Sequence, residues 1–312
     1  MSNELAAIWD ADGLPEAYPS QPIRYLDRTR AYYRTLGYAP YRWSHTEEVA
    51  FTPLRKALAE SRVVLLTTAA PYEPDRGDQG PGAAYNGGAK FFDVYAGSTL
   101  GEPDTRISHI GYDRTHTSAK DQNTWFPLHR LREAAATGRI GGIATQFLGI
   151  PTMRSQRVTI EQHAPEASVR CHDLGADVAL LVPNCPVCHQ SLSLVAQQLE
   201  RDGIPTVVLG AAKDIVEHVG VPRFAFSDVP LGNAAGRPFD VASQQLALES
   251  AFRLLECAAG PRSTWQTAVR WNGENHSWKC DFMNTANLDA ERARASFDAE
   301  KERAASVKAG VQ

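Results

Sequence analysis

Two apolar runs on either side of an amphipathic segment form the clearest pattern in the chain. Residues 176–184 (ADVALLVPN) and 204–210 (IPTVVLG) are apolar runs of strand length, which is typical of strands buried on both faces. Between them, before Gly203, four apolar side chains fall on one helical face: Leu192, Val195, Ala196 and Leu199. The order strand, helix, strand predicts a βαβ unit and therefore a parallel sheet.

The same reading assigns elements to the rest of the chain. Ile107 lies in a short β-like run that stops at Ser108 and His109, and the polar segment 75–88 is expected to be a surface connection or a mobile lid. Cys171 and Cys257 fall at apolar helical positions and are expected to be buried packing thiols. Helices are expected at 25–38, 46–61, 128–138, 161–173, 241–259 and 287–310, and further strands within 61–74, 140–150 and 223–240.

These elements predict an α/β protein with two Rossmann-like halves, each with a parallel sheet. The halves are expected at 61–155 and 156–260, preceded by an N-terminal helical arm (1–60) and followed by a C-terminal helical extension (261–312). Ligands of open parallel sheets bind beyond the carboxyl ends of the strands, so the site is expected in the cleft between the two sets of strand ends. The charged C-terminal helix is interpreted as a solvated face or an oligomer arm, and we expect a homo-oligomer.

Charge and cysteine content narrow the classes of function. With 32 basic and 36 acidic side chains the formal net charge is −4, which does not favour nucleic acid or an anionic membrane as partner; a small molecule is expected instead. Five irregularly spaced cysteines do not form the framework of a secreted disulfide protein. No signal peptide or membrane-spanning run is found, and a cytoplasmic protein is expected.

The strongest chemical signal is the sequence NCPVCH, in which Cys185, Cys188 and His189 follow an apolar strand directly. A Cys-x-x-Cys at the N-terminus of a helix favours the thiolate, because free backbone N–H groups and the helix dipole attract negative charge there. Three alternatives stay open at this point. They are a zinc site that recruits His109 or Cys280, a thioredoxin-like disulfide motif, and inert packing.

A second polar cluster follows the predicted strand near Ile107. His109 can exchange a proton near neutral pH, and Asp113 or Asp121 could orient its ring. Together with Tyr72, the polar residues of this region are the predicted substrate-binding set: Ser108, Tyr112, Asp113, Asp121 and Asn123.

Several motifs together resemble one family. SHIGYD, KDQNTWFPLHRLRE, NCPVCHQS, GIPTVVLG and VPLGNAAGRP occur in the order found in selenoprotein B subunits of the glycine, sarcosine, betaine and D-proline reductases, and the D-proline type is the most similar. The resemblance covers about residues 60–255. It implies a nucleophile, usually selenocysteine, that attacks the carbon α to the substrate carboxylate and displaces the amine in a reductive C–N cleavage. A partner subunit, often carrying a pyruvoyl group, is implied to hold the amine.

By this resemblance Cys185 takes the selenocysteine position as nucleophile, and Cys188 resolves its adduct as a disulfide that an external dithiol of the thioredoxin type reduces. His189 would help to stabilise the thiolate, while Ser108, His109 and Asp113 would line the facing side. Tyr72 stands where the resemblance leads us to expect a histidine.

A thiol is a weaker reductant than a selenol, and a carbon–sulfur bond is easier for it to cleave than a carbon–nitrogen bond. Cleavage of a carbon–sulfur bond, as in a desulfurase, therefore stays open beside C–N cleavage. No dinucleotide fingerprint or phosphate loop occurs, and we expect no bound cofactor, with zinc on Cys185, Cys188 and His109 as the alternative.

Overall fold

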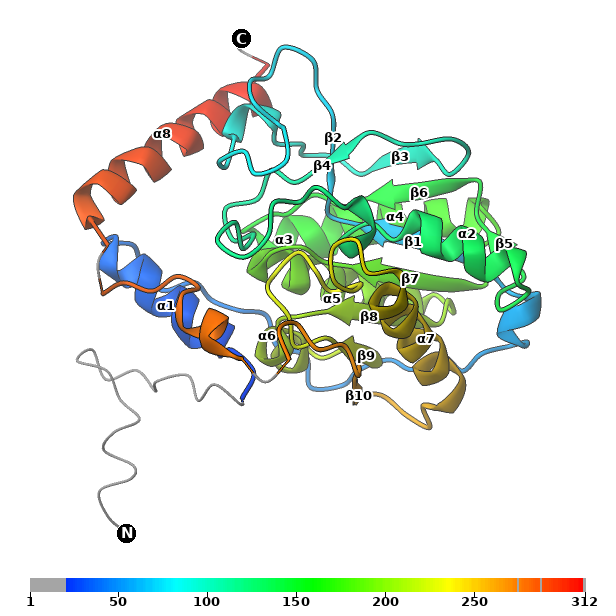
Figure 1. The fold of residues 1–312 in the computed structure, drawn as a ribbon. Helices are drawn as coiled ribbons and strands as arrows, with labels where there is room; N and C mark the ends of the chain where they lie inside the picture. Colours follow the sequence, from blue (N-terminus) through cyan, green and yellow to red (C-terminus); the bar gives the residue numbers. More distant parts are fainter. Residues whose placement is uncertain (1–20, 274, 287, 311–312) are drawn as a thin grey trace.

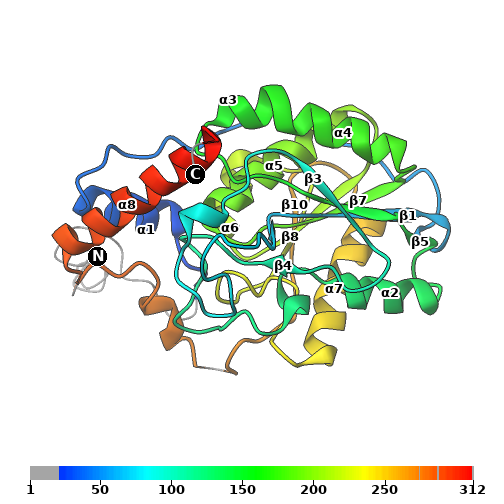
Figure 2. The same cartoon turned by 90° about the horizontal axis from the view of Figure 1, so that it is seen from above.

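A central eight-stranded sheet organises the computed structural model, which describes residues 21–273, 275–286 and 288–310 (Figures 1 and 2). Its strands lie in the order β10-β9-β8-β7-β1-β6-β3, with β5 also paired to β1, and all pairings are parallel except that of β3 with β6. The sheet strands are β1 (Arg62–Thr67), β3 (Tyr95–Ser98), β5 (Gly142–Ile143), β6 (Gln146–Gly149), β7 (Val178–Val182), β8 (Thr206–Gly210), β9 (Arg223–Phe226) and β10 (Ser263–Gln266). A separate small ribbon pairs β2 (Ala70–Pro71) with β4 (Thr105–Arg106).

Helices cover both faces of the sheet. The helices are α1 (Tyr25–Thr35), α2 (Leu128–Ala136), α3 (Gln156–Val158), α4 (Ala164–Asp173), α5 (Pro186–Arg201), α6 (Lys213–Val219), α7 (Val241–Cys257) and α8 (Ala290–Lys308), of which α8 lies away from the sheet (Figure 1). Alternate residues of each strand face opposite sides, so Val63 and Leu65 pack in the cluster with α2 and α7, and Val64 and Leu66 in the cluster with α4 and α5. Figure 2 shows these two helical layers on either side of the strands.

The mixed α/β class with a mostly parallel sheet is confirmed, but the two-half description is not. Strand β1, expected in the first half, pairs in parallel with β7 of the second over five residue pairs. One sheet therefore holds strands from both predicted halves. The division of the chain into an arm, two halves and an extension stays a prediction.

Most predicted elements are present, and one predicted helix is wrong. Between residues 46 and 57 the chain is irregular, because its polar groups bond to the core rather than to one another. The backbone N–H of Thr52 donates to Glu200 at 2.5 Å, and its carbonyl accepts from Arg223 at 2.7 Å. Glu200 and Arg223 form a fully buried ion pair at 2.9 Å, which holds this segment against β8 and β9.

Strand β3 and the short elements α3, α6 and β10 were not anticipated, and one cysteine is exposed where burial was expected. Helix α6 and edge strand β10 are short and lack a clear period in the sequence. Cys171 is fully buried, as predicted, whereas Cys257 at the end of α7 is exposed because its side of the helix faces away from the sheet. Gly138, the last residue of the helix predicted over 128–138, lies just beyond the end of α2 with φ +72°, the left-handed conformation in which glycine commonly ends a helix.

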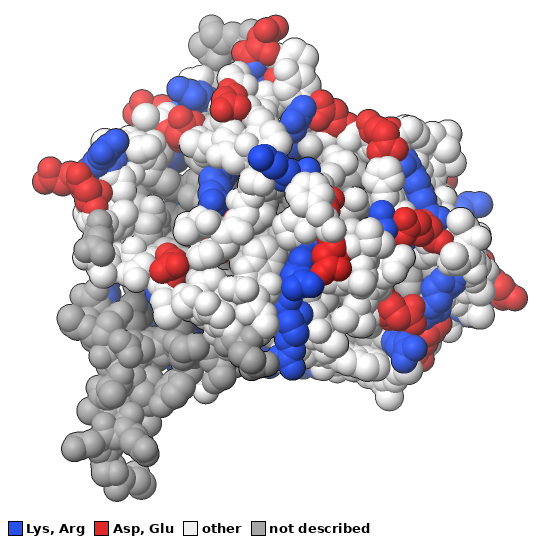
Figure 3. All heavy atoms as spheres, viewed as in Figure 1, with Lys and Arg blue, Asp and Glu red and all other residues white. Residues whose placement is uncertain are grey.

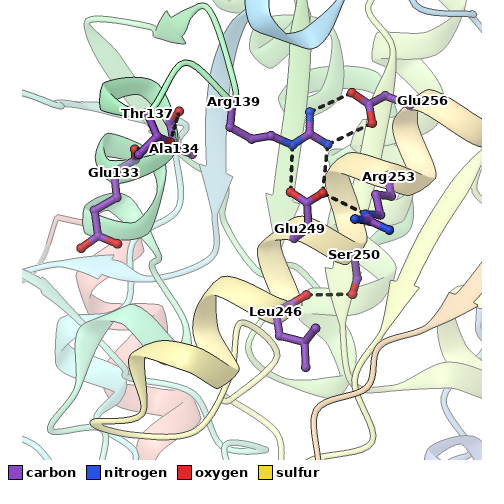
Figure 4. A network of polar contacts seen from close by, with 9 residues as sticks. All are labelled: Glu133, Ala134, Thr137, Arg139, Leu246, Glu249, Ser250, Arg253 and Glu256. Carbon is purple, nitrogen blue, oxygen red and sulfur yellow. Dashed lines mark hydrogen bonds and ion pairs between the residues drawn. The ribbon is translucent and has the colours of Figure 1, made fainter.

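An arginine cluster joins the turn after α2 to α7 (Figure 4). The guanidinium of Arg139 pairs with Glu249 and with Glu256, both at 2.8 Å, and Arg253 also pairs with Glu249 at 2.9 Å. This cluster is partly exposed and ties the helical layer together at its surface.

On the face in Figure 3, basic and acidic side chains are interspersed, and neither sign forms a broad patch. Among the described helices, none combines the length and apolarity that crossing a membrane requires.

Candidate active site

The turn between β7 and α5 places two thiols at the carboxyl end of the sheet. Cys185 is the N-cap of α5, and its sulfur accepts the backbone N–H of Cys188 at 3.3 Å. The two sulfur atoms lie 2.8 Å apart, and both thiols are free. Cys185 keeps 5% of its surface exposed, whereas Cys188 is completely buried behind it. Only Cys185 is therefore accessible to a molecule arriving from outside.

The surroundings of Cys188 favour its ionisation. Burial opposes the thiolate, but the hydrogen bond from Cys185, the neighbouring His109 and the Thr152 hydroxyl, at 3.0 Å from the sulfur, together hold the pKa of Cys188 well below that of a free thiol. For Cys185, burial and then the adjacent Cys188 raise the pKa well above that of a free thiol. In the resting pair the negative charge is therefore on the Cys188 sulfur and the proton on Cys185. The short distance between the two sulfur atoms lets this proton pass from one to the other.

His109 lies beside the thiol pair but is not oriented by a carboxylate. Its ring is buried, and its Nδ1 atom has no described hydrogen-bond partner. Its carbonyl accepts from the Arg114 guanidinium at 2.6 Å, which fixes the backbone of the loop. Asp113, expected as an orienting group, instead pairs with Nδ1 of His116 at 2.9 Å. Asp121 is likewise engaged elsewhere, accepting from the backbone of Phe239 at 2.7 Å.

The His189 ring faces the end of β8 rather than the sulfurs. It is completely buried; its Nδ1 lies 2.7 Å from the Cys185 carbonyl, and its Nε2 accepts the N–H groups of Ala211 and Ala212 at 2.9 and 3.1 Å. Accepting at Nε2 fixes the neutral tautomer with its proton on Nδ1. Burial lowers the pKa of His189 to about 4. The ring therefore positions the cysteine turn and carries no charge at neutral pH.

A cavity of about 160 Å³ opens beside Cys185. The predicted residues Cys185, Ser108 and His109 line it, and Gly111 lets their loop come close to α5. A Cβ atom on Gly111 would lie 2.5 Å from the Pro186 ring. The loop and the helix start therefore meet at a contact that only glycine allows.

The other predicted substrate-binding residues do not line this cavity. Tyr112 is buried against Gly232, and Tyr72 is 46% exposed, with its ring stacked under Arg106. Asp113 and Asp121 are engaged as described above, and Asn123 sits in the short turn that Asp121 caps. Their spacing along the chain gave no information on which way the side chains point.

Much of the cavity wall comes from segments whose role was not predicted. The arm contributes α1 and the residues after it, and the C-terminal extension contributes α8; Figure 1 shows the start of α8 near the end of α1. Ring contacts join them, with the Tyr33 and Phe297 centroids 5.7 Å apart. The density of tyrosines between residues 25 and 41 was the one available signal. The main residues missed are Tyr33, Tyr41, Tyr85, Lys90, Arg154 and Lys301.

The zinc alternative finds no support in the geometry. Within the described parts of the chain, no three His, Cys, Asp or Glu side chains are arranged to hold a metal ion. Cys185, Cys188 and His109 are neighbours, but they do not form such a group.

Comparisons with known proteins give the relationship of the chain. It is 31% identical over 195 residues to D-proline reductase subunit gamma of Acetoanaerobium sticklandii, a match that covers 62% of this chain and 77% of that subunit. It is 24% identical over 201 residues to sarcosine reductase complex component B subunit beta of Peptoclostridium acidaminophilum, covering 61% of this chain and 44% of the relative.

A third relative is glycine reductase complex component B subunit gamma of Peptoclostridium litorale, 24% identical over 188 residues, or 59% of this chain and 42% of that protein. No family model and no solved structure matches the chain. The first match confirms what the motifs indicated: the chain belongs to the family of D-proline, sarcosine and glycine reductase subunits.

Proposed function

We propose that this protein is a thiol-dependent reductase that cleaves a carbon–heteroatom bond, C–N or C–S, of a small amino-acid-like molecule. One observation carries the proposal: an accessible thiol, Cys185, lines a cavity, and a second thiol, Cys188, lies 2.8 Å behind it. The relatives are subunits of reductases, which supports a reductive reaction in general.

The first step forms a bond from Cys185 to the substrate. The Cys185 proton moves to the Cys188 thiolate across the short contact, and the Cys185 sulfur then attacks the carbon that bears the heteroatom. A carbon–sulfur bond forms, the carbon–heteroatom bond breaks, and the heteroatom leaves with the bonding electron pair and takes a proton. His109, beside the pair, is the donor we propose for that proton.

The second step reduces the carbon. The Cys188 sulfur, which took the Cys185 proton in the first step, attacks the Cys185 sulfur and forms the disulfide. The carbon leaves with the electron pair of the carbon–sulfur bond and takes the proton that Cys188 gives up. Two thiols are thereby oxidised and the substrate gains two electrons. An external dithiol of the thioredoxin type returns the disulfide to thiols, and a second reductase subunit is the partner we propose for presenting the substrate.

The test uses the full reduced chain and a panel of carboxylates with an amino, thio or halo group on the α-carbon. Wild type should release the reduced carboxylate and form the Cys185–Cys188 disulfide in equal amounts, as measured by mass spectrometry. Cys185→Ser should do neither, whereas Cys188→Ser should accumulate a Cys185 adduct. Cys257→Ser, which removes an exposed thiol, is the matched control and should behave as wild type. Full turnover in both Cys185→Ser and Cys188→Ser would refute the mechanism.

A further inference from the structure

The cavity beside Cys185 combines basic side chains with a lack of acidic ones. Lys90, Arg154 and Lys301 line it, and none of its described lining residues is Asp or Glu. Lys301 pairs with Asp298 at 3.4 Å. Neither Lys90 nor Arg154 forms an ion pair with any carboxylate in the described part of the chain. Positive charge is therefore available at this wall for a ligand.

The two unpaired cations act on the same space as the thiols. Burial lowers the pKa of Lys90, a negative charge on Cys185 raises it, and the neighbouring Arg154 lowers it. The Arg154 guanidinium lies 5.3 Å from the ring centroid of Tyr33 and 5.8 Å from that of Tyr41. An anion bound between Lys90 and the exposed Arg154 would relieve their mutual repulsion and would offset the cost of burying Lys90.

An apolar wall completes the cavity. Its aromatic rings come from the arm, the loop near residue 90 and α8: Tyr33, Tyr41, Trp43, Tyr85, Phe91 and Phe297. A volume of about 160 Å³ is close to the roughly 150 Å³ of an apolar cavity that accepts benzene. The wall thus fits a ring or a branched chain of that size.

Building on the function proposed above, we infer that the substrate is a small organic monoanion with an apolar body and an uncharged leaving group. Its carboxylate binds between Lys90 and Arg154, and its body packs against the aromatic wall. An ammonium group at the reacting carbon would face these cations without a described acidic partner, which like-charge repulsion disfavours. The bonds formed and broken are those of the mechanism above, with sulfur as the leaving atom, so this inference selects C–S cleavage from the two bonds proposed there.

The experiment compares two alkylating reagents that differ mainly in charge. Iodoacetate and iodoacetamide react with the reduced full chain, and the rate at each cysteine is followed by mass spectrometry, with exposed Cys257 as the internal reference. The ratio of the iodoacetate rate to the iodoacetamide rate should be about tenfold higher at Cys185 than at Cys257, as expected when more than one cation attracts the anion.

Charge-removing variants identify the cations responsible. Lys90→Met and Arg154→Met should each lower this ratio at Cys185 about threefold, the effect of one charge contact. Arg157→Met is the matched control, because it removes an exposed cation of the same segment that does not line the cavity, and it should leave the ratio unchanged.

Protection by unreactive ligands tests the lack of an ammonium site. 3-Phenylpropanoate, an anion without an ammonium group, should slow alkylation of Cys185 by iodoacetamide. L-Phenylalanine, which adds an ammonium group, and 3-phenylpropanamide, which lacks the carboxylate, should need about tenfold higher concentrations for the same protection. Equal or better protection by L-phenylalanine, or equal rate ratios at Cys185 and Cys257, would overturn the monoanion inference and leave the reductase proposal standing. If Cys185 in the reduced full chain reacts with neither reagent, the nucleophile itself is wrong and both proposals fall.

Discussion

The buried ring of His189 should make the stability of the protein depend on pH. In the unfolded chain a histidine has a pKa near 6.5, whereas in the folded protein burial lowers the pKa of His189 to about 4. Below pH 6.5 the unfolded state therefore binds a proton that the folded state refuses. The stabilisation by the neutral ring is fully present above pH 6.5 and is lost as the pH falls toward 4.

The size of the effect follows from the two pKa values. Their full difference corresponds to roughly 3 kcal/mol of unfolding free energy. Between about pH 7.5 and about pH 4.5 the loss is about 2.5 kcal/mol, because the folded ring is still mostly neutral at the lower value.

Urea unfolding at a series of pH values measures this loss. His189→Leu cannot titrate, so its unfolding free energy should fall by about 2.5 kcal/mol less than that of wild type over the same range. It should be less stable than wild type at neutral pH, because the N–H groups of Ala211 and Ala212 lose their acceptor. Other titrating groups, such as Asp214, whose pKa burial raises to about 6, are common to both proteins and cancel in the comparison.

His129→Gln, at a partly exposed histidine paired with Glu102, is the control. It should change the pH dependence much less than His189→Leu does, because an exposed ion pair contributes little to stability. If His189→Leu shows the same decrease with pH as wild type, the ring is not held neutral and the argument is refuted.

Three further predictions concern contacts described above. Glu200→Gln should lower the unfolding free energy by about 3 kcal/mol in urea unfolding, because it leaves the buried Arg223 cation unpaired. A double variant with Leu at both positions should recover part of this loss, and a double variant as unstable as Glu200→Gln would contradict the explanation. Arg139→Ala should cost only about 1 kcal/mol, and less in high salt, since its pairs are partly exposed; a loss of several kcal/mol in thermal unfolding would argue against it. Gly111→Ala should slow alkylation of Cys185 at least about fivefold, because the added methyl group displaces Pro186. The same overpacking should lower the unfolding free energy by about 1–3 kcal/mol. An unchanged alkylation rate would show that the contact does not position the thiol.

The parts of the fold that the sequence predicted are those in which local pattern and burial agree. The βαβ unit from 176 to 210 was clear because its strands are apolar on both faces and Gly203 ends its helix. The helix predicted over 46–61 was wrong because Thr52, in the middle of the segment, forms hydrogen bonds to the distant Glu200 instead of to its neighbours in the chain. Pairings between residues so far apart leave no periodic trace in the sequence.

The candidate site was likewise predictable only where its residues are close together in the sequence. The cysteine turn was recognisable because strand, turn and helix are contiguous, and the resemblance supplied roles for Cys185 and Cys188. The partners of Asp113 and Asp121 were not predictable, because several groups lie within reach along the chain and only the fold selects among them. Lys90 and Arg154 carried no local signal at all.

The joint between α1 and α8 has a consequence for motion. These helices close the cavity through ring contacts and the hydrogen bond from Tyr38 to Asp298 at 2.5 Å. Tyr25 of α1 belongs to the core that packs on the sheet, whereas no described residue of α8 does. Local opening costs less free energy than global unfolding where a segment buries few apolar side chains, and only Phe297 and Ala304 of α8 are buried. Amide hydrogens of α8 should therefore exchange with solvent well before those of β7 and β8. Local opening of this helix would then govern the access of small molecules to the thiols.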